Sequence, residues 1–286
     1  MQTTNQDEIR QAVRETYGKV AMAGGIASGT NPASSCCGAS DISPETEAAA
    51  SCSCGGEGLT LEQMSTAMGY AKNDLDDVPE GSNMGLGCGN PVALASLNPG
   101  ETVVDLGSGG GFDCFLAAKQ VGETATIIGV DMTPEMVSKA RTNAKKIGAD
   151  NVEFRLGEIE HLPVADNSAD IIMSNCVVNL SPDKLSVYRD AYRVLKPGGR
   201  LAISDILATA SLPEEIRKDL ALVSACVGGA ATIEDTEQLL KKAGFANITI
   251  KPKDNSRELF KEWYPNESKK AGDYVVSAYI EAVKPV

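Results

Sequence analysis

Short apolar runs alternate with amphipathic stretches along most of the chain. The run at 102–106 has the length of a buried strand, and apolar residues at helical spacing follow it from Phe112 to Val121. The same alternation predicts further strands at 125–131, 152–156, 169–175, 201–206, 246–250 and 274–282. Further helices are predicted at 7–21, 60–71, 133–147, 182–195, 213–226, 233–243 and, as a short insertion, 257–264. This order is typical of an α/β fold in which two late strands complete a parallel sheet.

Local signals define several helix ends. Thr60 and Gln63 have the spacing of a capping box, and Gly244 is a suitable C-cap for the helix before it. Thr133 is the predicted N-cap of a helix whose first residue is Pro134. The stretches predicted to form a loop and a turn between helices and strands are 74–89 and 196–200.

Residues 22–59 differ from the rest of the chain. They are rich in Gly, Ala and Ser and poor in large apolar side chains, so they cannot bury enough surface to fold alone. The segment nevertheless carries four thiols, those of Cys36, Cys37, Cys52 and Cys54. Two interpretations stay open: a mobile linker with incidental thiols, or a flexible arm that captures a thiol-seeking ligand.

Composition excludes several classes of function. A net charge of −13 over 286 residues argues against binding to nucleic acid or to an anionic membrane surface. No apolar run has the length of a membrane span, and the polar start at residues 1–8 is unlike a signal peptide. We therefore expect a cytoplasmic protein whose thiols are mostly reduced. The single histidine, His161, makes a Ser-His-Asp triad or a His-rich metal site a poor prospect.

A glycine-rich turn follows the strand at 102–106. Gly107, Gly109 and Gly111 let main-chain N–H groups approach a ligand, but Phe112 stands where the dinucleotide fingerprint has its third glycine. By itself the turn is also compatible with a tight strand–helix connection. The next strand ends in Asp131, and a carboxylate at that place suits a ribose diol. Together these features favour a nucleoside-containing cofactor.

Three of the eight cysteines lie beside glycine or at the predicted end of a strand or helix: Cys88, Cys176 and Cys226. Three soft thiolates suit a thiophilic, three-coordinate centre, whereas structural zinc would require a fourth ligand. Cys114 lies within a predicted helix and is expected to be a packed core thiol. His161 is expected to be structural or to lie on the surface.

The glycine turn and the strand-end carboxylates, Asp105 and Asp131, resemble the cofactor site of class I S-adenosylmethionine-dependent methyltransferases. The resemblance implies a Rossmann-like seven-stranded sheet with an N-terminal helical or flexible extension and a C-terminal segment. It also implies that the glycines contact the methionine part of S-adenosylmethionine, that Asp131 binds the ribose and that Met132 lines the adenine. The candidate cofactor contacts are Asp105, Gly107, Ser108, Gly109, Gly111, Asp131, Met132, Glu158, Ile159 and Asn175.

A narrower resemblance covers most of residues 60–230. Three strings, Met-Gly-Leu-Gly-Cys-Gly-Asn-Pro at 84–91, Gly-Val-Asp-Met-Thr-Pro-Glu-Met at 129–136 and Ser-Asn-Cys-Val-Val-Asn-Leu at 174–180, are similar to arsenite methyltransferases. The resemblance implies that thiolate-bound trivalent arsenic is methylated, as a route of arsenic detoxification. It implies Cys88, Cys176 and Cys226 as the catalytic, arsenic-binding residues, with Cys36 or Cys37 as candidates for a further N-terminal one.

The same resemblance implies partners and a division of the chain. The substrates would be arsenite or thiol-conjugated arsenicals, with a thioredoxin- or glutathione-like reductant and neither nucleic acid nor membrane as partner. Residues 1–59 would form a helix and a cysteine-containing arm, and 60–210 the domain that binds S-adenosylmethionine. Residues 211–286 would complete the sheet and the substrate site.

Two other functions are compatible with parts of the pattern. A methyltransferase of a small organic acceptor would carry the cysteines incidentally, and its activity would survive Cys176→Ser. A metalloid- or metal-binding sensor would use the same thiols without cofactor turnover. The Ser-Asn-Cys string at 174–176 argues against the first, and the intact cofactor motif at 105–111 argues against the second.

Overall fold

The structure, a computed structural model, describes residues 6–25, 60–253 and 272–286. In these ranges the strands form one seven-stranded sheet in the order β3-β2-β1-β4-β5-β7-β6. The strands are β1 (Thr102–Leu106), β2 (Thr126–Asp131), β3 (Val152–Leu156), β4 (Ala169–Asn175), β5 (Leu195–Ala208), β6 (Ala246–Pro252) and β7 (Val275–Val283). β1 to β5 are parallel, and β7 runs antiparallel between β5 and β6. This confirms the predicted class I methyltransferase-like fold.

Helices cover both faces of the sheet because successive strand residues point to opposite sides. Val103 packs into the apolar cluster on the face of α4 (Pro91–Ala95), α5 (Phe112–Val121) and α6 (Pro134–Ile147). Val104 packs into the cluster on the other face, beneath α7 (Lys184–Val194) and α10 (Ile233–Ala243). Burial on both sides explains the apolar runs in the middle of β1, β2 and β4, whereas the edge strand β3 also carries Glu153 and Arg155.

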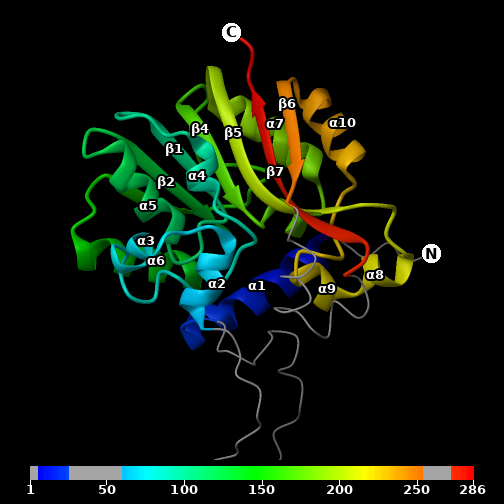
Figure 1. The fold of residues 1–286 in the computed structure, drawn as a ribbon, viewed down its shortest axis with the longest axis horizontal. Helices are drawn as coiled ribbons and strands as arrows, with labels where there is room; N and C mark the ends of the chain where they lie inside the picture. The colour runs from blue at the N-terminus through cyan, green and yellow to red at the C-terminus, as the bar shows by residue number, and fades with distance from the viewer. Residues whose placement is uncertain (1–5, 26–59, 254–271) are drawn as a thin grey trace, which may run out of the picture.

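The remaining helices gather at one end of the sheet (Figure 1). They are α1 (Gln6–Ala23), α2 (Leu61–Met68), α3 (Lys72–Asp76), α8 (Glu214–Lys218) and α9 (Leu220–Ser224), with a 3₁₀ turn, η2, at Val178–Leu180. The first helix, α1, packs against α6, α9 and η2. It therefore joins the two halves of the chain at this end.

Most of the predicted helix ends are confirmed. Gln63 N donates to Thr60 Oγ1 at 3.2 Å, and Thr60 N donates back to Gln63 Oε1 at 2.8 Å, which completes the capping box. Gly244 closes α10 with a left-handed φ of 107°. Thr133 is the N-cap of α6, but its side chain makes no capping bond. Its N–H donates to Asp131 Oδ1 at 2.8 Å instead.

The stretch from 60 to 95 differs from the prediction. The helix after Thr60 ends at Met68 and does not reach Ala71, because Gly69 adopts a left-handed φ of 102°. The predicted loop at 74–89 begins inside α3. Sequence reasoning also missed α4, although Asn90 caps it and Pro91 occupies its first turn.

Two further boundaries are corrected. The predicted helix at 213–226 is divided into α8 and α9, because the Asp219 side chain accepts from Ala221 N and starts a new helix there. The predicted turn at 196–200 lies within β5. This stretch of β5 stays in the sheet because Gly198 N donates to Lys284 O at 2.8 Å. The pairing of β5 with β4 accommodates it by a shift of register between Ala169 and Ile171.

Some predictions lie outside the described residues: the helical insertion at 257–264 and the four thiols of Cys36, Cys37, Cys52 and Cys54. Within the described ranges, the structure contains no helix with both the length and the apolarity needed to cross a bilayer.

Candidate active site

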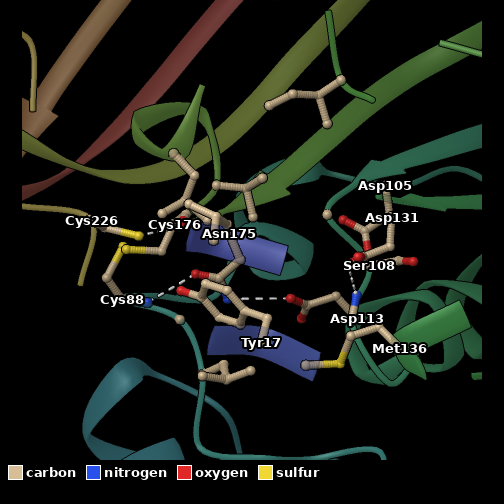
Figure 2. A pocket seen from close by; sticks show the side chains of 18 of the residues that line it. Tyr17, Cys88, Asp105, Ser108, Asp113, Asp131, Met136, Asn175, Cys176 and Cys226 are labelled. Carbon is tan, nitrogen blue, oxygen red and sulfur yellow. Dashed lines mark hydrogen bonds between the residues drawn. The ribbon is translucent and has the colours of Figure 1, made fainter. Parts of the chain in front are cut away.

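A pocket opens at the carboxyl edge of the sheet, where the segments after β1, β2, β3 and β4 meet α1. Figure 2 shows two groups of side chains facing this space. Three thiols lie at one end, and the glycine turn with its carboxylates lies at the other. Tyr17 and Asn175 lie between the two groups. The fold thus brings together residues that are far apart in the sequence, as expected for a ligand site in a doubly wound fold.

The glycine turn is held against the end of β2. Gly107 N and Ser108 N both donate to Val130 O, at 2.7 and 3.1 Å, and Gly109 N donates to Asp131 Oδ2 at 3.0 Å. Gly107 has a φ of 68°, and a Cβ there would lie 2.4 Å from Val177. A larger residue is therefore excluded at this position, which lines the pocket.

Several groups at this end fit a cationic nucleoside cofactor. Ser108 Oγ is buried and lacks a hydrogen-bond partner in the described part of the chain, yet it borders the pocket. Burial and the neighbouring Asp113 charge raise the pKa of Asp105. Burial also raises the pKa of Asp131, while bonds from Thr133 and Gly109 oppose the rise. Buried carboxylates and a spare hydroxyl suit the ammonium and ribose of S-adenosylmethionine.

Two predicted cofactor contacts are not among the residues that line the pocket. Glu158 forms ion pairs with Arg10 and Arg14, and its neighbours Ile159 and Glu160 border the pocket instead. Gly111 is the N-cap of α5, where a Cβ would clash with Phe154 and Phe115. The other predicted contacts line the pocket: Asp105, Gly107, Ser108, Gly109, Asp131, Met132, Ile159 and Asn175.

The three predicted thiols converge at the other end of the pocket. Cys88, Cys176 and Cys226 are all buried and all line it. The Cys226 Sγ donates to Cys176 O at 2.7 Å. Both Cys176 and Cys226 have left-handed backbones, with φ of 59° and 62°. Such φ values are uncommon for residues with side chains and are concentrated at functional sites.

Two of the three thiols, those of Cys176 and Cys226, have a raised pKa. Hydrogen bonds with Cys226 and Cys88, followed by burial, raise the pKa of Cys176 well above its usual value. A hydrogen bond with Cys176 lowers the pKa of Cys226, but burial and the Asp205 charge outweigh it. The Cys176 and Cys226 thiols are thus close together without the repulsion of two thiolates, and a ligand that displaces their protons converts them into soft donors.

The loop that carries Cys88 is fixed by Asn175. The Asn175 side-chain oxygen accepts from Cys88 N at 2.9 Å, and its Nδ2 donates to Gly89 O at 2.8 Å. The loop passes so close that a Cβ on Gly87 would lie 2.8 Å from Asn175 Nδ2. Lys253 Nζ also donates to Cys88 O, at 3.0 Å. These contacts set the direction of the Cys88 thiol.

Asn175 also reaches the cofactor end. Its Nδ2 lies 3.0 Å from Tyr70 Oη and 3.2 Å from Asp113 Oδ2. Tyr70 in turn donates to Asp113 Oδ1 at 2.6 Å. Burial raises the pKa of Asp113 to about 6, although the bonds from Tyr70 and Asn175 oppose the rise. One amide therefore connects the pocket carboxylate of Asp113 with the loop that carries Cys88.

The N-terminal helix closes one side of the pocket. Arg10, Val13 and Tyr17 of α1 line it, and Tyr17 Oη donates to Ser224 O at 3.1 Å. Arg10 is anchored by ion pairs with Glu160, at 3.2 Å, and Glu158, at 3.5 Å. This helix therefore both packs against the rest of the fold and closes one side of the pocket.

The other sequence candidates behave as expected. Cys114 is fully buried in the apolar cluster under α5 and donates to Asp105 Oδ2 at 3.3 Å. His161 is exposed at the surface.

Sequence reasoning missed several residues around the thiols. Ser277 Oγ, on β7, donates to Cys88 O at 2.9 Å, and Lys253 directly follows β6. Asp205, on β5, offers a carboxylate oxygen within 4.8 Å of the Cys88 and Cys176 sulfurs. The position of Asp205 could have been predicted from sequence. It lies in the strand that follows α7, and the carboxyl ends of parallel strands meet at one edge of the sheet. The others depend on antiparallel pairing, for which local sequence gives no signal.

The sequence is similar to those of known methyltransferases. A family model described as a methyltransferase domain matches residues 97–244. An arsenite methyltransferase of Halobacterium salinarum is 49% identical over 98% of this chain and 67% of its own length. The human arsenite methyltransferase is 44% identical over 50% of this chain and 40% of its own length. The chain thus spans two thirds of the archaeal relative and less than half of the human one.

Structural comparison gives the same result. The crystal structure of an arsenic(III) S-adenosylmethionine methyltransferase from Chlamydomonas reinhardtii is 31% identical, with a TM-score of 0.58 over 78% of this chain and 73% of that one. A phosphoethanolamine N-methyltransferase from Haemonchus contortus, 19% identical with a TM-score of 0.60, shares the fold alone. The chain therefore belongs to the arsenite methyltransferase family, within the class I S-adenosylmethionine-dependent methyltransferases.

Proposed function

We propose that this chain transfers methyl groups from S-adenosylmethionine to trivalent arsenic bound by Cys88, Cys176 and Cys226. The convergence of three buried thiols on a pocket shared with the glycine turn supports this most strongly. Arsenite and thiol-conjugated arsenicals are the substrates, and methylated arsenicals are the products. The name of the archaeal relative, with which nearly the whole chain aligns, supports the same substrate.

The thiols bind the substrate by exchange. Each cysteine that attacks arsenite forms an As–S bond, and its proton leaves with the displaced hydroxyl as water. The protonated state of Cys176 suits this exchange, because the proton stays available for the leaving group. Arsenic bound by three sulfurs keeps one lone pair. Since that lone pair carries no proton, methyl transfer needs no general base, which agrees with a pocket that has no histidine among its lining residues.

Alignment is then the main task of the protein. When bound, the cofactor would supply a sulfonium methyl group, to which the arsenic lone pair forms an As–C bond as the S–CH₃ bond breaks. Gly107 to Gly110 and Asp131 line one end of the pocket, and the cysteines line the other. Asn175 ties the two ends together, so that both reactants are held in register. Fixing two reactants in this way is worth about 7–11 kcal/mol of a reaction barrier.

Methylation converts trivalent arsenic to the pentavalent state. Two thiols can return it to the trivalent state by supplying two electrons and forming a disulfide. We propose that a thioredoxin- or glutathione-like reductant reduces that disulfide. We also propose that the segment with Cys36, Cys37, Cys52 and Cys54 takes part in this exchange or in arsenic capture.

The test is turnover with S-adenosylmethionine, arsenite and a reducing thiol, with the arsenic species separated by chromatography. The wild type should form methylated arsenic. Cys176→Ser and Cys226→Ser should each lower the rate at least about a hundredfold, because two sulfurs do not complete the arsenic site. Binding of S-adenosylhomocysteine should stay within a few-fold of wild type in both variants.

Cys114→Ser is the matched control, because this thiol is buried outside the pocket lining and serine keeps a donor for Asp105. It should retain most of the activity. Wild-type turnover by Cys176→Ser would reject the three-thiol site. Cofactor binding with no methylated arsenic in the wild type would instead favour a small organic acceptor.

A further inference from the structure

Asp205 is a buried carboxylate with one oxygen left over. The residue is 1% exposed. Its Oδ1 accepts from Asn179 Nδ2 at 2.9 Å and from Ile206 N at 2.7 Å. Its Oδ2 has no hydrogen-bond partner anywhere in the described ranges. Leaving a buried carboxylate oxygen unpaired is costly, so the arrangement calls for an explanation.

The place of Asp205 offers one. A carboxylate oxygen of Asp205 and the sulfurs of Cys88 and Cys176 all lie within 4.8 Å of one another. Two thiols and a carboxylate are a donor set for Zn²⁺ and similar thiophilic divalent cations. Metal-binding carboxylates are commonly oriented by hydrogen bonds to protein groups, as Asn179 and Ile206 orient Asp205 here.

We propose that Cys88, Cys176 and Asp205 also form a site for Zn²⁺, which competes with arsenic for the two thiols. Binding releases the two thiol protons to solvent and forms two Zn–S bonds and one Zn–O bond. No electron is transferred. The competition, but not the cation site itself, rests on the proposed function of the cysteines.

The geometry allows such a cation to enter and leave. Cys88 and Cys176 line the pocket, whereas Asp205 lies behind them and does not. The cation would thus keep one coordination position open towards the pocket. Atoms 4.8 Å apart lie about 2.8 Å from a common centre, so an inward shift of roughly 0.5–0.8 Å by each donor gives zinc–ligand distances of about 2.0–2.3 Å.

The nearest lysine does not fill the site. The charge of Lys184 acts on Asp205 and stabilises its ionised form. Its Nζ, however, donates to Ser181 O at 3.0 Å and not to the unpaired Oδ2. A divalent cation would therefore supply a contact that the described residues lack. Trivalent arsenic bound by three sulfurs is neutral and gains no comparable charge pairing from Asp205.

That difference defines the experiment. Zinc affinity is measured on the full chain by competition with a chromophoric chelator, under a phosphine reductant that keeps the thiols reduced. All variants carry serine at Cys36, Cys37, Cys52 and Cys54, so that these thiols do not contribute. The chain should bind one Zn²⁺, and Asp205→Asn should weaken zinc binding at least about tenfold, because the amide oxygen is neutral and a weaker zinc ligand than a carboxylate.

Asp170→Asn is the matched control, because it removes one carboxylate charge from the opposite end of β4, where Asp170 pairs with Lys196. It should bind Zn²⁺ like the parent. Arsenite affinity should be equal in all three proteins, and added Zn²⁺ should slow arsenite loading until chelator is added. Equal zinc affinity of Asp205→Asn and the parent would overturn the inference.

The outcome is separable from that of the proposed function. Zinc binding that depends on Asp205, in a wild type that forms no methylated arsenic, would support the cation site and reject arsenic methylation. If the wild type methylates arsenic and Asp205→Asn binds zinc as tightly as the parent, the cation site is rejected and the proposed function is not.

Discussion

Asp205 makes the stability of the protein depend on pH. Burial raises its pKa to about 6, with the Lys184 charge and main-chain hydrogen bonds opposing the rise. The folded state therefore holds this proton more tightly than the unfolded chain does. Stability is highest below the unfolded pKa, near 4, and falls as the pH rises towards 6.

Asp205→Asn should remove that dependence. Between pH 5 and pH 7.5, the wild type should lose about 1 kcal/mol of unfolding free energy relative to the variant. Urea unfolding of both proteins at the two pH values measures the difference, in which the other titrating groups cancel. A constant difference between the proteins would show that this carboxylate titrates normally.

Gly87 fixes the approach of the Cys88 loop to Asn175. Its φ is 119°, and a Cβ would lie within 3 Å of the Asn175 amide. Gly87→Ala should therefore displace the loop and weaken arsenite binding at least about tenfold, while cofactor affinity changes little. Arsenite and S-adenosylhomocysteine titrations check both expectations.

Gly122→Ala separates steric contact from backbone strain. Gly122 also has a positive φ, 81°, but nothing lies within 4 Å of its Cβ position. This variant should lose about 1–3 kcal/mol of stability and keep wild-type arsenite affinity. A similar loss of affinity in both variants would show that general destabilisation, and not the Asn175 contact, accounts for the effect.

Single residues were predictable where their chemistry is unusual. Cysteine beside glycine and aspartate after an apolar run pointed directly to Cys88 and Asp131. The prediction of Glu158 named the correct loop but not the residue at the pocket. Glu158 pairs with arginines of α1, and the nearby Glu160 borders the pocket. Which of two nearby acids faces a pocket depends on the path of the loop, which no local pattern encodes.

The first helix depends on ion pairs for its position. Arg10 is 15% exposed and meets Glu158 and Glu160, while Arg14 is 43% exposed and meets Glu158 only. Removing one partner of a buried ion pair costs more free energy than removing one partner of an exposed pair. Arg10 should therefore contribute more than Arg14 to holding α1 in place.

Arg10→Gln should weaken cofactor binding several-fold and increase hydrogen exchange along α1. Arg14→Gln should change both much less. Hydrogen exchange by mass spectrometry and S-adenosylmethionine titration give the two readouts. Equal effects of the two substitutions would mean that apolar packing through Val13, not the Arg10 pairs, holds the helix.

Helix ends were predicted well where a capping residue lies at the end of the apolar helical pattern and not inside it. The capping box of α2 and the C-cap of α10 illustrate this. The break between α8 and α9 was missed because Asp219 sits in a continuous helical pattern and acts as a cap only in the folded chain. Pairing of Gly198 with Lys284 keeps β5 extended through a turn-like sequence, which is a tertiary effect.

The complete molecule explains why the pocket needs distant segments. The thiols come from the loop before α4, the end of β4 and the end of α9, and α1 covers them from the N-terminus. The parallel topology predicted that residues after β1, β2 and β4 would meet. Lys253 and Ser277 contact the Cys88 loop from the end of β6 and from β7. The antiparallel pairing of these two strands is a long-range feature that local sequence does not predict.

The most direct test of the account is one turnover without external reductant. Full-length protein is loaded with one equivalent of arsenite and mixed with S-adenosylmethionine labelled in its methyl group. The account predicts that the label moves to arsenic in wild type and stays on the cofactor in Cys176→Ser. Label retained on the cofactor in the loaded wild type, or transferred to arsenic equally by both proteins, would contradict methyl transfer to a three-thiol arsenic site.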